Sequence, residues 1–207
     1  MENAVNKNKP LSLTDLLRKH FKGIVDPIGK FFNRLGVRPN TITFLGLVGS
    51  TIGAVLLAQG QMVLGGIVIL IMGPVDALDG TMARLRGESS EFGAFVDSVT
   101  DRYSELVIMG GLLAYYLIEQ NWTGAFLVYV AAVGSFLVSY VRARGQSLGF
   151  ETKVGILTRV ERYLVLGPSL VINQPLIGLG IIAVFANFTA LQRILDVRRQ
   201  AHASKNN

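Results

Sequence analysis

Long apolar stretches dominate this sequence and restrict it to one structural class. Six mostly apolar runs, separated by polar residues, cover residues 41–58, 62–79, 93–118, 124–142, 156–172 and 176–195. A helix needs about 20 apolar residues to cross a bilayer. Half of the 207 residues are hydrophobic and 16% are charged, which is too apolar for a soluble domain of this size. We therefore predict an all-α integral membrane protein with six transmembrane helices.

The chain before the first span has a different pattern. Over residues 11–38, Leu and other apolar residues recur at helical spacing among basic residues. This pattern is typical of an amphipathic helix in the membrane interface. We predict a polar N-terminal tail over 1–10, a juxtamembrane helix over 11–38, a transmembrane domain over 39–197 and a polar, basic tail over 198–207.

The distribution of basic residues predicts the topology. The connections over 59–61, 119–123 and 173–175 contain no Lys or Arg, so all 20 basic residues lie on the opposite side or in span ends near it. Positive charge is retained on the cytoplasmic side. We expect both termini to be cytoplasmic in a cell membrane, the inner or plasma membrane. Because the charge follows the membrane edge, we expect the lipid bilayer, and no nucleic acid, as a partner.

Four aspartates mark the junction of the second and third spans. From Asp76 to Asp101 the sequence follows the pattern D-x2-D-G-x2-A-R-x8-G-x3-D-x3-D. The spacings from Asp76 to Asp79 and from Asp97 to Asp101 put each pair on one helix face. Two facing helices would bring four mutually repelling carboxylates together, and such a cluster needs a cation. Taken singly, each aspartate is equally well explained as a helix-end charge facing water.

The residue types in this pattern suggest the ligands. Oxygen ligands without Cys or His favour Mg²⁺ or Mn²⁺, and four carboxylates suit two ions. Gly80, Ala83 and Gly93 remove side-chain bulk where a backbone or ligand must come close. Arg84 adds a cation suited to phosphate. Together these residues predict a site for a metal and a diphosphate.

The complete pattern resembles the signature of the CDP-alcohol phosphatidyltransferase family, and it matches at every fixed position. The resemblance implies six transmembrane helices after a juxtamembrane helix, with residues 39–197 as the catalytic domain. It also implies a homodimeric enzyme that uses Mg²⁺ or Mn²⁺. The reaction transfers a phosphatidyl group from CDP-diacylglycerol to an alcohol and releases CMP.

The resemblance also implies a role for each site residue. Asp76, Asp79 and Asp97 would be metal ligands, and Asp101 would be the general base with a metal contact. The CDP-lipid site would consist of Asn40, Thr43, Asp76, Asp79, Gly80, Ala83, Arg84 and Gly93. For the segment with Asn40 and Thr43, which follows Pro39, a plain helix cap is the alternative.

Cations near the ends of the last three spans bear on the acceptor. The stretches SYVRARGQSLG and KVGILTRVERYLVLG look like the corresponding region of prokaryotic phosphatidylinositol phosphate synthases. In that subfamily a basic pocket binds the acceptor phosphate, and the matching positions here are Ser139, Arg142, Arg162 and Arg193. Position 142 often carries Lys there, so Arg142 keeps the charge and changes the geometry. Singly, these cations could instead enforce topology and contact lipid headgroups.

Inositol 1-phosphate is therefore the predicted acceptor, and phosphatidylinositol phosphate the product. Glycerol 3-phosphate is the alternative, because any small phosphorylated alcohol needs an anion pocket. The apolar spans do not distinguish an ester from an ether lipid donor. A non-enzymatic divalent-cation transporter would explain the aspartates, but it would not explain the fixed Gly, Ala and Arg positions between them.

Overall fold

The described chain is helical. The computed structural model describes residue 23, residues 26–87 and residues 90–204, with the side chains of residues 76 and 77 outside the description. A helical segment over residues 26–34 lies within the predicted juxtamembrane helix, and residues 11–22, 24 and 25 of that prediction fall outside the described residues. The remaining helices are α2 (Pro39–Ala58), α3 (Met62–Arg86), α4 (Glu91–Ile118), α5 (Trp122–Ser147), α6 (Arg159–Val171) and α7 (Pro175–Ala203).

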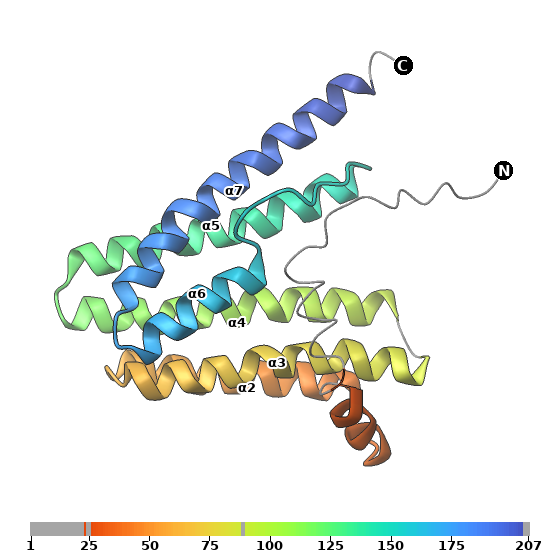
Figure 1. The fold of residues 1–207 in the computed structure, drawn as a ribbon, viewed down its shortest axis with the longest axis horizontal. Helices are drawn as coiled ribbons and strands as arrows, with labels where there is room; N and C mark the ends of the chain where they lie inside the picture. The colour runs from red at the N-terminus through yellow and green to blue at the C-terminus, as the bar shows by residue number, and fades with distance from the viewer. Residues whose placement is uncertain (1–22, 24–25, 88–89, 205–207) are drawn as a thin grey trace.

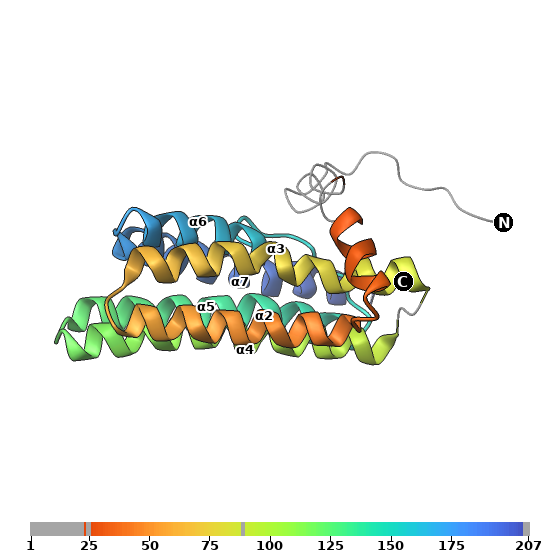
Figure 2. The same ribbon diagram turned by 90° about the horizontal axis from the view of Figure 1, so that it is seen from below.

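The helices run up and down beside one another (Figures 1 and 2). Helix α2 packs on α3 and α4, α6 packs on α3 and α7, and α5 packs on α4 and α7. The starts of α2, α4 and α6 and the ends of α3, α5 and α7 therefore gather at one end of the bundle (Figure 1). We call this the polar end, because the predicted site residues lie there.

Four of the described helices are long and apolar enough to cross a bilayer: α2, α3, α5 and α7. Helix α4 has 28 residues, but Asp97, Asp101, Arg102 and Glu105 interrupt its apolar sequence. Helix α6 has 13 residues, fewer than the roughly 20 that a straight crossing needs. Among the described residues, four of the six predicted spans are thus long and apolar enough to cross a bilayer.

The fifth predicted span starts later than the sequence suggested. Residues 156–158 are not helical, and α6 begins at Arg159. The hydroxyl oxygen of Thr189 on α7 accepts hydrogen bonds from the backbone N–H groups of Ile156 and Leu157, at 3.2 and 3.1 Å. Residues 156–158 therefore lie outside the helix, because a contact with α7 satisfies the N–H groups of Ile156 and Leu157 in place of a helical turn.

Apolar side chains lie both inside and outside the bundle. Leu112, Leu170 and Ile182 have no exposed surface, whereas Phe44 and Phe126 are 63% and 66% exposed. So many exposed large apolar side chains are unfavourable in water and favourable against lipid. This surface and the four apolar helices indicate a multi-pass membrane protein.

Candidate active site

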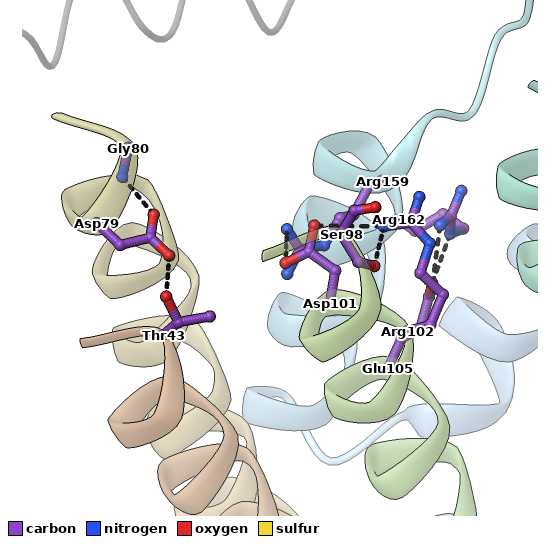
Figure 3. Close-up of polar contacts among 9 residues, drawn as sticks. All are labelled: Thr43, Asp79, Gly80, Ser98, Asp101, Arg102, Glu105, Arg159 and Arg162. Atoms are coloured by element: carbon purple, nitrogen blue, oxygen red, sulfur yellow. Dashed lines mark hydrogen bonds and ion pairs between the residues drawn. The ribbon is translucent and has the colours of Figure 1, made fainter. Parts of the chain in front are cut away.

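The first part of the site lies where the start of α2 meets the end of α3. The hydroxyl of Thr43 donates a hydrogen bond to Asp79 Oδ2 at 2.5 Å, and the backbone N–H of Gly80 donates to Asp79 Oδ1 at 2.5 Å (Figure 3). Thr43 and Asp79 are 5% and 6% exposed. Hydrogen bonds to an ionised carboxylate are strong. The two donors therefore fix the orientation of this carboxylate inside the helix packing.

Beside Asp79 the surface of α3 is open. Among the described residues, a Cβ added at Gly80 would meet only a guanidinium nitrogen of Arg84, at 3.5 Å. Arg84 is exposed, and its Nη2 donates to the hydroxyl of Thr81 at 2.8 Å. Ala83, partly buried one turn after Gly80, adds only a methyl group. This strip therefore carries only small side chains at Gly80 and Ala83, beside the exposed guanidinium of Arg84.

The start of α4 carries the other half of the predicted pattern. Ser90 caps the helix, and its hydroxyl oxygen accepts a hydrogen bond from the backbone N–H of Gly93 at 3.0 Å. This cap fixes the beginning of the helix. Asp97 and Asp101 follow one and two turns later, and both are partly buried.

Arginines surround Asp97 and Asp101. Arg159 Nη1 at the start of α6 lies 2.6 Å from Asp101 Oδ1, and Arg102 Nη1 lies 3.5 Å from Asp101 Oδ2. Arg102 also donates to the carbonyl oxygen of Ser98 at 2.6 Å (Figure 3). Asp97 stands one turn before Asp101 on the same face of α4. The carboxylates of α4 therefore have cationic neighbours from their own helix and from α6.

A buried ion pair lies one turn deeper, between α4 and α6. Arg162 Nε and Nη2 donate to Glu105 Oε1 and Oε2 at 2.6 and 2.9 Å, and Arg162 Nη1 donates to the carbonyl oxygen of Leu157 at 3.3 Å. Arg162 is 2% exposed. Sequence reasoning missed Glu105, although its position four residues after Asp101 places it on the same helix face.

Arg193 lies under the connection between α5 and α6. Its Nε donates to the carbonyl oxygen of Val154 at 2.9 Å, and its Nη1 donates to that of Val138 at 2.7 Å. Arg193 is 3% exposed. Val138 lies on α5, which carries Arg142, and Val154 lies in the connection that leads to α6 and Arg162, so Arg193 joins the segments that carry the other two predicted acceptor-site arginines.

The two remaining predicted residues of this group lie on the last turns of α5. Ser139 is partly buried, and Arg142 is exposed at the polar end. Arg142 is thus the predicted acceptor-site arginine that solvent reaches most directly. The deeper Arg162 and Arg193 already donate hydrogen bonds to groups of the protein.

Asn40 has a simpler position. It is exposed in the first turn of α2, and the N-cap residue of this helix is Arg38, without a side-chain capping bond. The alternative that Asn40 or Thr43 caps the helix was therefore wrong. Pro39 at the first position explains the helix start, since it lacks the N–H that a cap would satisfy.

The four predicted metal ligands come from α3 and α4. Asp76 belongs to α3, but its side chain lies outside the description. Among the described side chains, no group of three or more His, Cys, Asp or Glu residues is close enough to hold a metal ion. Convergence of Asp76, Asp79, Asp97 and Asp101 stays a prediction. The donor chemistry fits a hard divalent cation, because Asp79 presents carboxylate oxygens beside the Thr43 hydroxyl.

Comparison with known proteins identifies the family. Residues 36–192 match the sequence profile of the family described as CDP-alcohol phosphatidyltransferase. This range includes the aspartate pattern and the arginines of α6, and it ends just before Arg193. The chain belongs to the CDP-alcohol phosphatidyltransferase family. It is therefore a transferase, and the predicted chemistry, transfer of a phosphatidyl group from a CDP-linked lipid to an alcohol, is confirmed at the level of the family.

Two relatives named for their activity match nearly the whole chain. A phosphatidylinositol phosphate synthase of Streptomyces avermitilis is 35% identical over 206 residues, which cover 91% of this chain and 84% of the relative. An archaetidylinositol phosphate synthase of Pyrococcus horikoshii is 31% identical over 185 residues, which cover 89% and 96%. The predicted likeness to this subfamily is confirmed.

A solved structure has the same fold. The phosphatidylinositol phosphate synthase of Mycobacterium tuberculosis with CDP-DAG bound superposes with a TM-score of 0.79 at 28% identity, covering 84% of this chain and 93% of that chain. A second structure of that enzyme is in complex with manganese and citrate, with a TM-score of 0.78 at 29% identity. These structures support dependence on a divalent metal in this family.

Proposed function

We propose that this protein transfers the phosphatidyl group of CDP-diacylglycerol to inositol 1-phosphate and so produces phosphatidylinositol phosphate and CMP. One observation carries the choice of acceptor: Arg193 donates hydrogen bonds to the carbonyl oxygens of Val138, one turn before Arg142 on α5, and of Val154, in the connection that leads to Arg162 on α6. Like charges gathered beside a membrane repel, and an anion relieves that repulsion. The names of the relatives support the same acceptor.

The donor is held at the junction of α2, α3 and α4. Asn40, Thr43, Gly80, Ala83, Arg84 and Gly93 would contact the nucleotide and its phosphates. The open strip at Gly80 and the exposed Arg84 guanidinium support this assignment. Related structures contain CDP-DAG and, separately, manganese.

The four aspartates would hold two Mg²⁺ or Mn²⁺ ions. When bound, these cations polarise phosphoryl oxygen and offset the charge on the departing CMP. Thr43 and the Gly80 N–H orient Asp79 for this task, as the partners of ligating carboxylates do elsewhere. Asp101 acts as the general base and takes the proton of the acceptor hydroxyl.

In the acceptor pocket, Arg142 makes the first contact with the phosphate because it is exposed. Ser139 stands one turn before it on α5. Arg193 and Arg162 add positive charge from deeper in the bundle, where carbonyl oxygens and Glu105 fix the orientation of the two guanidinium groups. Glycerol 3-phosphate would use the same anion pocket and is the second candidate.

The membrane arrangement belongs to the same proposal. Six helices would cross or enter the bilayer, with the short α6 and the charged start of α4 at the polar end. That end and both termini would face the cytoplasm, since the connections at the other end contain no Lys or Arg. We expect a homodimer, as the family resemblance implies.

An acceptor panel with purified protein tests this function. CMP release from CDP-diacylglycerol is followed with inositol 1-phosphate, glycerol 3-phosphate, inositol or serine, with Mg²⁺, Mn²⁺ or EDTA. We expect turnover with inositol 1-phosphate and either metal, and none with EDTA. Turnover with glycerol 3-phosphate alone would reject the acceptor. No CMP with any acceptor would favour the transporter alternative.

A further inference from the structure

Two ion pairs join α4 to α6, one helical turn apart, and they differ in burial. In the outer pair, Arg159 and Asp101, the side chains are 28% and 13% exposed. In the inner pair, Arg162 and Glu105, they are 2% and 11% exposed. The acids stand four residues apart on α4 and the arginines three apart on α6. The pairs are therefore consecutive contacts between the same two helices (Figure 3).

The inner pair is a permanent anchor. Glu105 accepts two hydrogen bonds from Arg162, which also donates to a backbone carbonyl oxygen. The cavity that borders this pair measures about 10 Å³, which has room for about one water molecule and no substrate. Removing one partner would leave a buried charge uncompensated. This pair therefore keeps α6 in place on α4.

The outer pair is the less buried of the two. Arg159 is the more exposed partner, and its guanidinium carbon lies 5.6 Å from the centre of the Tyr163 ring. Solvent reaches Arg159 more than Arg162, so the outer pair is screened more and costs less to separate than the inner pair. A phosphate offers more charge and more acceptor oxygens than a carboxylate, and the planar guanidinium binds it well. A phosphate at the polar end could thus replace Asp101 as the partner of Arg159.

We propose that Arg159 exchanges partners during the reaction: it holds Asp101 while the acceptor site is empty, and it binds the phosphate of the acceptor when the acceptor arrives. This inference rests on the proposed function. The exchange releases a carboxylate oxygen of Asp101 beside the incoming hydroxyl. The hydroxyl oxygen then bonds to the lipid phosphorus, its proton passes to Asp101, and the bond from phosphorus to the CMP oxygen breaks.

The exchange gives selectivity against water. Attack by water on the same phosphorus would yield phosphatidic acid and CMP, with the proton again passing to Asp101. Water carries no phosphate and does not displace Asp101 from Arg159. The intact outer pair therefore suppresses hydrolysis of the donor until a phosphorylated acceptor is bound.

The test compares Arg159→Ala and Arg159→Lys with Lys153→Ala, a control in the connection just before α6 whose exposed side chain pairs with exposed Glu151. CMP release is measured with Mg²⁺ over a series of inositol 1-phosphate concentrations and with no acceptor. In Arg159→Ala we expect the acceptor KM to rise about tenfold or more, since a charged hydrogen bond is lost. The donor KM should stay within about twofold, because Arg159 contacts no donor atom in this scheme.

Two further readouts isolate the exchange. The ratio of acceptor-independent to acceptor-dependent CMP release should rise in Arg159→Ala, and Arg159→Lys should restore part of the wild-type ratio. Calorimetric titration with inositol 1-phosphate, without CDP-diacylglycerol, should show weaker binding to Arg159→Ala. Lys153→Ala should match the wild type in every measurement.

Unchanged acceptor KM, acceptor binding and hydrolysis ratio in Arg159→Ala would overturn the exchange. If Arg159→Ala does not fold, Arg159→Lys decides by the same measurements, because it keeps the charge and loses the planar geometry. The proposed function fails separately, since wild-type protein would then release no CMP with inositol 1-phosphate.

Discussion

Thr43 and Asp79 form one unit although they are 36 positions apart. The hydroxyl of Thr43 and the N–H of Gly80 each satisfy one oxygen of the same buried carboxylate. A buried carboxylate without such donors would be costly, and it could also rotate away from a metal. At the residue scale, Thr43 therefore contributes to the site by orienting the carboxylate of Asp79.

Replacing Thr43 with Val removes this donor and keeps the volume. We expect the metal concentration for half-maximal activity to rise about tenfold or more, since the partner that orients a ligand is lost. Thr43→Ser should restore most of the wild-type value, because it keeps the hydroxyl. Metal titrations of CMP release measure both. Equal behaviour of the Val and Ser variants would show that the hydroxyl has no role.

Asp101 is the residue on which the proton transfer depends. Asp101→Asn keeps the shape and loses the base, so turnover should fall by about 10²-fold or more. Binding of CDP-diacylglycerol, followed with a labelled donor, should stay measurable. Asp196→Asn is a matched control, because Asp196 lies on α7 and accepts a hydrogen bond from Gln200. Wild-type rates in Asp101→Asn would remove Asp101 from this role.

At the scale of elements, the connection between α5 and α6 decides where α6 begins. Thr189 and Arg193 of α7 bind backbone groups of residues 154, 156 and 157 in this connection. Gly155 has a φ of +135°, and a Cβ there would lie 2.3 Å from Thr189 Cγ2. The connection can pack against Thr189 of α7 because Gly155 has no side chain to meet the Thr189 methyl group.

Gly155→Ala should therefore destabilise the protein, by about 1–3 kcal/mol from backbone strain together with the clash. Gly149→Ala is the matched control: its φ is +84°, and a Cβ there would meet nothing within 4 Å. Thermal unfolding in detergent measures both variants. The Gly155 variant should have the lower Tm, and equal Tm values would show that the contact with Thr189 is unimportant.

At the scale of the whole molecule, the arrangement in the bilayer is open to a direct measurement. The chain has no Cys, so single-Cys variants report one position each. Glu119→Cys and Gln174→Cys, both at exposed positions opposite the polar end, should react with an impermeant maleimide in intact cells. Gln146→Cys, exposed at the polar end, should react only after permeabilisation. The reverse labelling pattern would show that the polar end faces the outside of the cell.

Much of the local structure could be predicted from the sequence, because it depends on local periodicity. Apolar runs predicted the positions of α2, α3, α5 and α7, and the spacing of Asp97 and Asp101 placed both on one face of α4. The length of α6 could not be predicted, since it depends on Thr189, which lies 33 residues from Ile156. Glu105 was missed for a similar reason, because its partner Arg162 is 57 residues away.

The sequence by itself determined the class, the family and the chemistry. Spans require contiguous apolar residues, and the aspartate pattern is a linear signature, so neither needs a fold to be recognised. Only the tertiary structure decided which arginine meets which acid. Helix α6 packs so that Arg162 enters the bundle to bind Glu105, while Arg159 stays at the polar end against Asp101. The burial of each guanidinium, which sequence spacing does not encode, separates the anchor from the exchangeable partner.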